Sequence, residues 1–153
     1  MVTIRYYTEN DLDTVVTLWY KSWSNMFPEL KHPQPFEAWK FRFKNDLAIN
    51  STAWVAENQS RIVGFIVINQ IKGILEQIFV DVDVQGIGIG TALLNKAKRI
   101  CPLGLSLTTL QQNLQARKFY EKHGFVAGKL GVNPVNGQTN IEYIWIPNTD
   151  SRS

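Results

Sequence analysis

The sequence predicts a single α/β (α+β) domain in which helices cover both faces of a mixed sheet. The chain has 153 residues, 44% hydrophobic and 19% charged, as expected for one packed core. Runs of β-prone residues alternate with segments of helical periodicity, in the order β, α, α, β, β, β, α, β, α, β, β. In the middle of the chain a strand, a glycine-rich turn and a helix follow one another, which is typical of a ligand-binding α/β fold.

The first third of the chain is predicted to contribute one strand and two helices. Residues 1–7 alternate between apolar and polar side chains as a strand does. A capping box then begins a helix over about 9–24. A proline-containing loop leads into a second helix over about 36–47, whose apolar residues share one face.

The next segment is predicted to form a hairpin and a third strand. Residues 53–56 and 61–68 are β-prone and flank a short polar stretch, which indicates a hairpin. A strand over 74–82 follows Gly73. Its alternation places Glu76, Ile78, Val80 and Val82 on one face, and Leu75, Gln77, Phe79 and Asp81 on the other.

A glycine turn opens the second half of the chain. The helix that begins at this turn has apolar residues at helical spacing and ends at Pro102. A strand over 103–110 comes next, and Asn113 caps a further helix that ends at Gly124. His123, at the end of that helix, is expected to have a structural role.

Two strands close the predicted domain. They cover about 125–132 and 139–146 and are joined by a turn that contains Asn136-Gly137. No repeat or long polar linker interrupts the chain. We therefore expect one domain over 1–147, followed by a loose C-terminal tail over 148–153.

Composition argues against several classes of protein. The net charge is only +3 and no run of five Lys or Arg occurs, so nucleic-acid binding is unsupported. The longest apolar stretch, residues 62–68, is too short to cross a membrane. One cysteine, Cys101, allows neither an internal disulfide nor a zinc finger, and no signal-peptide pattern begins the chain, so we expect a cytoplasmic protein.

The glycine turn is predicted to bind phosphate. Gly86, Gly88 and Gly90 leave backbone N–H groups unobstructed where a helix begins and its dipole is positive. A mononucleotide P-loop is excluded because no lysine follows the last glycine before Lys96. A dinucleotide fingerprint is excluded because Thr91 stands where its last glycine is required.

Two sequence blocks resemble those of the GNAT acetyltransferases. The first, which matches the family's Gln/Arg-x-x-Gly-x-Gly/Ala signature, is Gln85-Gly86-Ile87-Gly88-Ile89-Gly90-Thr91. The second is residues 113–125, which is similar to the block Asn-x-x-Ala-x-x-Phe-Tyr-x-x-x-Gly-Phe. Ile78-Phe79-Val80 also resembles the family's strand end. The resemblance extends over roughly 2–147, although the first two helices belong to the family's variable part.

This resemblance implies the GNAT fold and a site for acetyl-CoA. The fold would be a mostly antiparallel sheet of about six to seven strands, with a splayed central parallel pair over 74–82 and 103–110. Acetyl-CoA would lie there as cosubstrate, without a metal. The implied binding residues are Ile78, Phe79, Val80, Val82, Gln85, Gly86, Ile87, Gly88, Ile89, Gly90, Thr91, Asn113, Ala116, Phe119 and Tyr120.

The implied activity is transfer of an acetyl group directly to an amine of a small-molecule or peptide acceptor. The Val80 N–H would stabilise the oxyanion, and Tyr120 would protonate the leaving thiolate. Glu76 is the first candidate for the base, with ordered water and Glu142 as alternatives, whereas Asp81 and Asp83 are expected to be turn residues. The alternative function is a non-catalytic acyl-CoA-binding or sensor module.

The acceptor cannot be derived from the sequence. Residues 22–50 would form the acceptor wall but carry no identifiable motif. The candidates to line it are His32, Trp23, Phe27, Trp39 and Phe43, although core packing is the alternative for most of these aromatics. A monomer and a homodimer both stay open, as does preference for an acyl group longer than acetyl.

Overall fold

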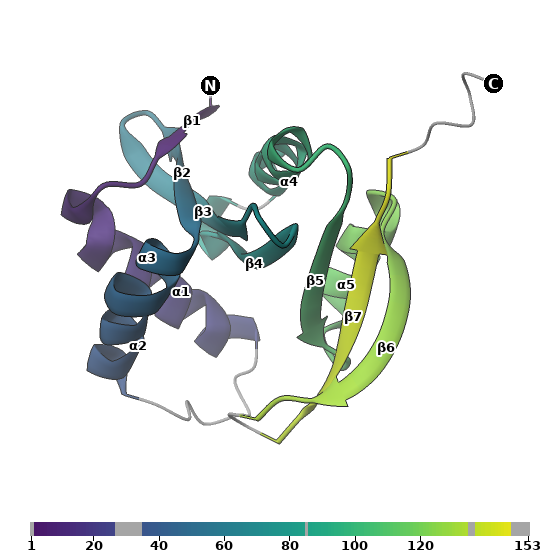
Figure 1. Ribbon diagram of the computed structural model, residues 1–153. Coiled ribbons are helices and arrows are strands. Elements are labelled where there is room, and N and C mark those ends of the chain that lie inside the picture. The colour runs from purple at the N-terminus through teal and green to yellow at the C-terminus, as the bar shows by residue number, and fades with distance from the viewer. Residues whose placement is uncertain (1, 27–34, 85, 135–136, 148–153) are drawn as a thin grey trace.

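The computed structural model describes residues 2–26, 35–84, 86–134 and 137–147 (Figure 1). Its strands form one seven-stranded sheet in the order β1-β2-β3-β4-β5-β7-β6. All neighbouring strands are antiparallel except β4 and β5, which confirms the predicted mixed, mostly antiparallel sheet. The strands are β1 (Val2–Tyr6), β2 (Thr52–Asn58), β3 (Arg61–Asn69), β4 (Ile74–Val80), β5 (Leu105–Leu110), β6 (Val126–Val132) and β7 (Thr139–Trp145).

The helices follow the predicted periodicity with local differences at their ends. The first predicted helix is a 3-10 turn over Glu9–Asp11 that continues into α1, and the second is divided by a π turn over Phe43–Leu47. The α-helices are α1 (Leu12–Met26), α2 (Phe36–Arg42), α3 (Ala48–Asn50), α4 (Ile89–Ile100) and α5 (Leu114–Lys122). No helix in the described ranges is both long and apolar enough to cross a membrane.

The sheet separates two hydrophobic clusters. On β3, Ile66 and Ile68 belong to one cluster, which also contains the apolar faces of α4 and α5. Phe65 and Val67 belong to the other cluster, together with apolar residues of α1 and α2. Alternate side chains of the central strand are therefore buried on opposite faces, as expected for a strand with a continuous apolar run.

The α1–α2 side of the sheet is packed with aromatic rings. The rings of Trp19 and Trp39 are 4.6 Å apart between centroids, and Phe43 lies 5.8 Å from Phe65 of β3. Phe43 is 0% exposed. These contacts make the segment over 36–50 part of the core and fix it against the sheet.

The start of α1 is held by a buried carboxylate. Asp11 forms the predicted capping box, in which the Thr8 N–H donates to its carboxylate at 2.8 Å. Arg5 of β1 donates two further hydrogen bonds to Asp11, at 2.8 and 2.9 Å. These bonds with Arg5 are the main reason that the pKa of Asp11 is lowered.

β4 differs from the sequence prediction in its length and in the order of its faces. The strand ends at Val80, and Val82 lies in a 3-10 turn. The register against β3 slips by one residue at Glu76, which is therefore the extra residue of a β-bulge. Leu75 consequently joins the same cluster as Ile78, so the predicted alternation of faces along this strand is wrong.

Candidate active site

The glycine turn leaves open space beside the N-terminus of α4. Gly86 and Gly88 have φ angles of +92° and +87°, a conformation that other residues rarely adopt. A Cβ at either position would have no atom within 4 Å. Gly88 is the residue before α4, and its carbonyl accepts the Ala92 N–H at 3.0 Å. The first N–H groups of α4 have no acceptor inside the helix, so the turn fits a phosphate-bearing ligand.

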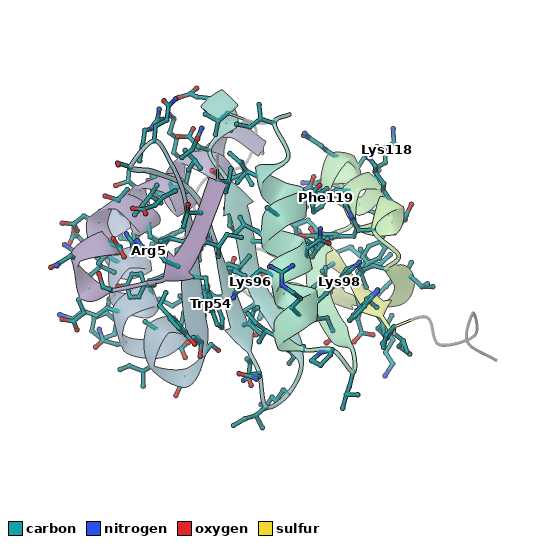
Figure 2. The ribbon with its side chains drawn as sticks, turned by 90° about the horizontal axis from the view of Figure 1, so that it is seen from above. Arg5, Trp54, Lys96, Lys98, Lys118 and Phe119 are labelled. Carbon is teal, nitrogen blue, oxygen red and sulfur yellow. The ribbon has the colours of Figure 1, made fainter. Side chains whose placement is uncertain are left out.

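Gly90 brings the two sequence blocks together. A Cβ on Gly90 would lie 3.3 Å from the ring of Phe119 on α5, so glycine permits this close helix contact. The neighbouring Thr91 hydroxyl and His123 Nε2 are 3.3 Å apart. Figure 2 shows α4 and α5 side by side, with Phe119 on α5. His123 therefore joins the end of α5 to the first turn of α4, in agreement with its expected structural role.

β4 and β5 separate beyond their first residues. Ile74 and Ser106 are the one residue pair that the described parts of these two parallel strands share. Beyond that pair the strands run apart, as Figure 1 shows. This is the splayed central parallel pair that the resemblance implies, and it leaves the edge of β4 that faces β5 without a strand partner.

The ladder with β3 fixes the direction of the backbone groups on β4. The Asp81 N–H, one residue beyond the strand, donates to the Val63 carbonyl of β3 at 2.8 Å. In an antiparallel ladder, the backbone N–H groups of successive residues point alternately toward the partner strand and away from it. The N–H groups of Val80 and Ile78 therefore point away from β3 and toward β5. Phe79 instead pairs with β3, and its ring stacks on Phe65.

Tyr120 projects from α5 into the cluster between the helices and the sheet. Its side chain is 7% exposed and packs against Phe119, Phe125 and Tyr143. Its hydroxyl forms no hydrogen bond to another residue in the described parts of the chain. Burial raises the pKa of this phenol, so the proton stays on the oxygen at neutral pH.

The carboxylates named from the sequence fall into two kinds. Glu76 is half-buried at the bulge of β4 and Glu142 is half-buried on β7, and neither forms an ion pair with a described residue. Asp81 is buried and binds Arg61 at 2.8 Å, while its other oxygen accepts the Asp83 N–H at 3.0 Å. Asp81 is therefore a structural turn residue, as expected.

The other predicted residues lie at the edges of this site. Asn113 caps α5, because its Oδ1 accepts the Ala116 N–H at 3.1 Å. Gln85 lies outside the described residues, as do Phe27 and His32, and nothing is described of the Trp23 side chain. Trp39 and Phe43 are buried between α1, α2 and the sheet, so these two form the core rather than an acceptor wall.

Sequence reasoning missed two residues that support the site. A Cβ on Gly64 of β3 would lie 2.9 Å from the Phe79 carbonyl and 3.1 Å from Leu93 of α4. Lys98 of α4 donates to the His123 carbonyl at 2.6 Å, and its ammonium lies 5.0 Å from the centre of the Trp145 ring. The signal for Gly64 is a glycine inside an apolar strand, which often marks a close approach of another part of the chain. No local sequence pattern marks Lys98.

No group of three His, Cys, Asp or Glu side chains that could hold a metal ion occurs in the described part of the chain. Cys101 is buried, and burial raises the pKa of its thiol, which suits an unreactive core residue.

Comparisons with known proteins agree with this geometry. The family model described as "Acetyltransferase (GNAT) domain" matches residues 50–127. An uncharacterized N-acetyltransferase of Methanocaldococcus jannaschii is 32% identical over 80% of this chain and 60% of its own length. The peptidyl-lysine N-acetyltransferase YjaB of Salmonella typhimurium is 30% identical over 87% of this chain and 90% of its own length.

The fold is also found in a solved structure. The PaiA N-acetyltransferase from Thermoplasma acidophilum in complex with coenzyme A has a TM-score of 0.71 and 22% identity, and covers 93% of this chain and 98% of its own. The chain spans only 60% of the M. jannaschii relative, so the relatives are not all of one length. The family model and the YjaB relative show that this chain belongs to the GNAT family of acetyltransferases.

Proposed function

We propose that this protein is an acetyl-CoA-dependent N-acetyltransferase that moves the acetyl group directly to an amine. The observation that carries the proposal is the edge of β4, where the N–H groups of Ile78 and Val80 face the gap left by β5. This edge ends close to the glycine turn, which begins a few residues later in the chain. A ligand with an amide-containing arm and a diphosphate fits both features.

The proposed binding of acetyl-CoA uses mostly backbone groups. The diphosphate would accept hydrogen bonds from N–H groups over 86–91, where the glycines leave space and the dipole of α4 is favourable. The pantetheine arm would pair with Ile78 and Val80 as a substitute strand partner for β4. The coenzyme A complex of the PaiA protein, which has the same fold, supports this assignment.

The proposed reaction needs a donor at the oxyanion and a proton for the sulfur. The amine nitrogen attacks the thioester carbon, the carbon–sulfur bond breaks, and the amide and free coenzyme A form. The Val80 N–H would stabilise the negative charge that develops on the carbonyl oxygen. Tyr120, whose hydroxyl is protonated and unpaired among the described residues, would give its proton to the thiolate. The proton that the amine nitrogen loses passes to the base and then, through solvent, to the Tyr120 phenolate, so the reaction neither gains nor loses a proton overall.

Glu76 is the proposed base. Its carboxylate is half-buried, has no ion-pair partner in the described parts of the chain, and lies four residues before Val80 on the strand. At the bulge, the Glu76 side chain does not take the direction that it would have in a regular strand. Ordered water therefore stays an alternative base. Glu142 is the other alternative, since it too forms no ion pair with a described residue.

We further propose the extent of the catalytic domain, the location of the protein and a class of acceptor. A single catalytic domain would cover 1–147, and the protein would act in the cytoplasm as a monomer or a homodimer. Similarity to the peptidyl-lysine acetyltransferase YjaB supports a lysine side chain as one class of acceptor, beside small-molecule amines. Nucleic-acid and membrane partners are not part of the proposal.

A thiol-release assay tests the function. Purified protein is incubated with acetyl-CoA and a panel of amines, lysine peptides and aminoglycosides, and free coenzyme A is titrated with a thiol reagent. Release that depends on both the acceptor and Tyr120 supports the transferase. Binding of acetyl-CoA without acceptor-dependent release would support the sensor module instead.

A further inference from the structure

In one half of the sheet, one face is not covered by a helix or strand of the described residues. Ile141 and Tyr143 of β7 are buried in the cluster with α5, so Glu142 between them lies on the opposite face. Thr108 of β5 is paired with Glu142 and is exposed there, and Ile144 is 40% exposed. On the same face, α1 and α2 cover the strands on the other side of the β4–β5 gap.

Glu142 is a carboxylate without a cation. It forms no ion pair with any described residue, Lys129 of the adjacent strand β6 included. Its Oε1 lies 3.1 Å from the place where a Cβ on Gly128 would be, so the glycine and the register shift of β6 make room for the carboxylate. A part-exposed carboxylate that forms no ion pair with a described residue can accept a charge-assisted hydrogen bond from a cationic ligand.

Glu142 and Glu76 lie on the two strands that neighbour β5. Ile74, two residues before Glu76, is opposite Ser106, and Thr108, two residues after Ser106, is opposite Glu142. The two carboxylates thus flank β5 from its two neighbouring strands. Strand spacing separates their backbones by about 10 Å, and the splay of β4 adds to this distance.

We propose that Glu142 binds a second cationic group of the acceptor while the reacting amine lies at the thioester. This inference rests on the proposed function and names its substrate class: an amine that carries a further ammonium or guanidinium group several bonds away. A charge-assisted hydrogen bond to Glu142 would orient that acceptor across β5. Glu142 is then a specificity residue, and Glu76 keeps the role of base.

The test compares acceptors that differ in one charge. Initial rates are measured with 1,6-diaminohexane and with 1-aminohexane, at saturating acetyl-CoA, for the wild type and for Glu142→Gln. We expect the wild type to prefer the diamine by about tenfold or more in kcat/KM, and the variant to lose that preference. Glu9→Gln, which removes an exposed carboxylate near β1, is the matched charge control and should keep the preference.

A charge reversal separates recognition from a structural effect. Glu142→Lys should prefer 6-aminohexanoate, whose second group is a carboxylate, over 1,6-diaminohexane. Rates are also compared for two blocked dipeptides, Lys-Arg and Lys-Gln, which differ in the second cationic side chain. A preference for Lys-Arg indicates a peptide acceptor, whereas a preference only among the small amines indicates a diamine. The inference is overturned if the wild type turns over both acceptors without preference, or if Glu142→Gln keeps the preference. Absence of coenzyme A release with every amine would instead contradict the proposed function.

Discussion

The two halves of the sheet are packed differently. β1 to β4 lie between hydrophobic clusters on both faces, with α1 and α2 on one side and α4 on the other. β5 and β7 pack in one cluster with α5 on one face, whereas all seven residues of β6 are exposed. The half that is packed on both faces provides a rigid edge, β4, whereas the other half leaves surface for a substrate. Substitutions inside the clusters of the first half should therefore lower stability, whereas substitutions on the exposed face of the second half should affect acceptor binding.

Tyr120→Phe should give the largest effect and should act on chemistry alone. The hydroxyl has no hydrogen-bond partner among the described residues, so its removal leaves the ring packing on β7 and Phe125 unchanged. Loss of a general acid should lower kcat by about a hundredfold or more. Steady-state rates give the loss, and the melting temperature and acetyl-CoA affinity should stay near those of the wild type. An unchanged kcat would remove Tyr120 from the mechanism.

Gly64→Ala and Gly128→Ala compare the halves directly. A Cβ on Gly64 would lie 2.9 Å from the Phe79 carbonyl oxygen, and this backbone atom cannot move aside easily. Gly64→Ala should therefore lower the free energy of unfolding by about 1 to 3 kcal/mol. The Cβ on Gly128 would meet the movable end of Glu142 at 3.1 Å and should cost less, while changing acceptor preference. Urea unfolding of both variants measures the difference, and equal losses would contradict the comparison.

Asp11→Asn should weaken the first half in a pH-dependent way. The hydrogen bonds from Arg5 lower the pKa of Asp11 in the folded state, so the unfolded chain binds this proton more tightly. The stabilisation is therefore present above about pH 4 and is lost as the pH falls through the folded-state value. We expect a cost of about 1 to 2 kcal/mol at pH 7. Wild type and variant should approach one another in stability at low pH, and a constant difference would refute this assignment.

Ser22→Ala is a smaller test of the same region. Ser22 lies on α1, is 3% exposed, and its hydroxyl has no hydrogen-bond partner among the described residues. Removing a buried, unsatisfied hydroxyl should stabilise the protein by about 1 kcal/mol, which thermal unfolding can detect. A loss of stability would show that the hydroxyl has a partner in solution.

Much of the fold could be predicted because local signals agree with one another. The capping box at Asp11, the glycines of the turn and the Asn113 cap each specify an element boundary that the structure confirms. The bulge at Glu76 could not be predicted, since it results from register between β3 and β4 and has no turn residue to mark it. The sequence also could not decide whether Phe43 is buried in the core or lines a pocket, because an aromatic residue at helical spacing is compatible with both.

The parts of the site that consist of backbone groups could be predicted from the sequence. The direction of the Val80 N–H follows from strand pairing, and the open space at Gly88 follows from its positive φ. The acceptor surface depends instead on residues far apart in sequence, such as Glu142 and Thr108, which only the sheet brings together. Contacts of this kind have no signature in a single sequence.

The most direct test of the account is a calorimetric titration with coenzyme A and with pantetheine, which lacks the diphosphate. If backbone N–H groups of the glycine turn hold that diphosphate, the wild type binds coenzyme A at least tenfold more tightly than pantetheine. Gly88→Ala, which strains a residue with φ of +87°, should reduce this difference while leaving pantetheine binding unchanged. Equal affinity of the wild type for the two ligands, or no binding of coenzyme A, would contradict the central claim.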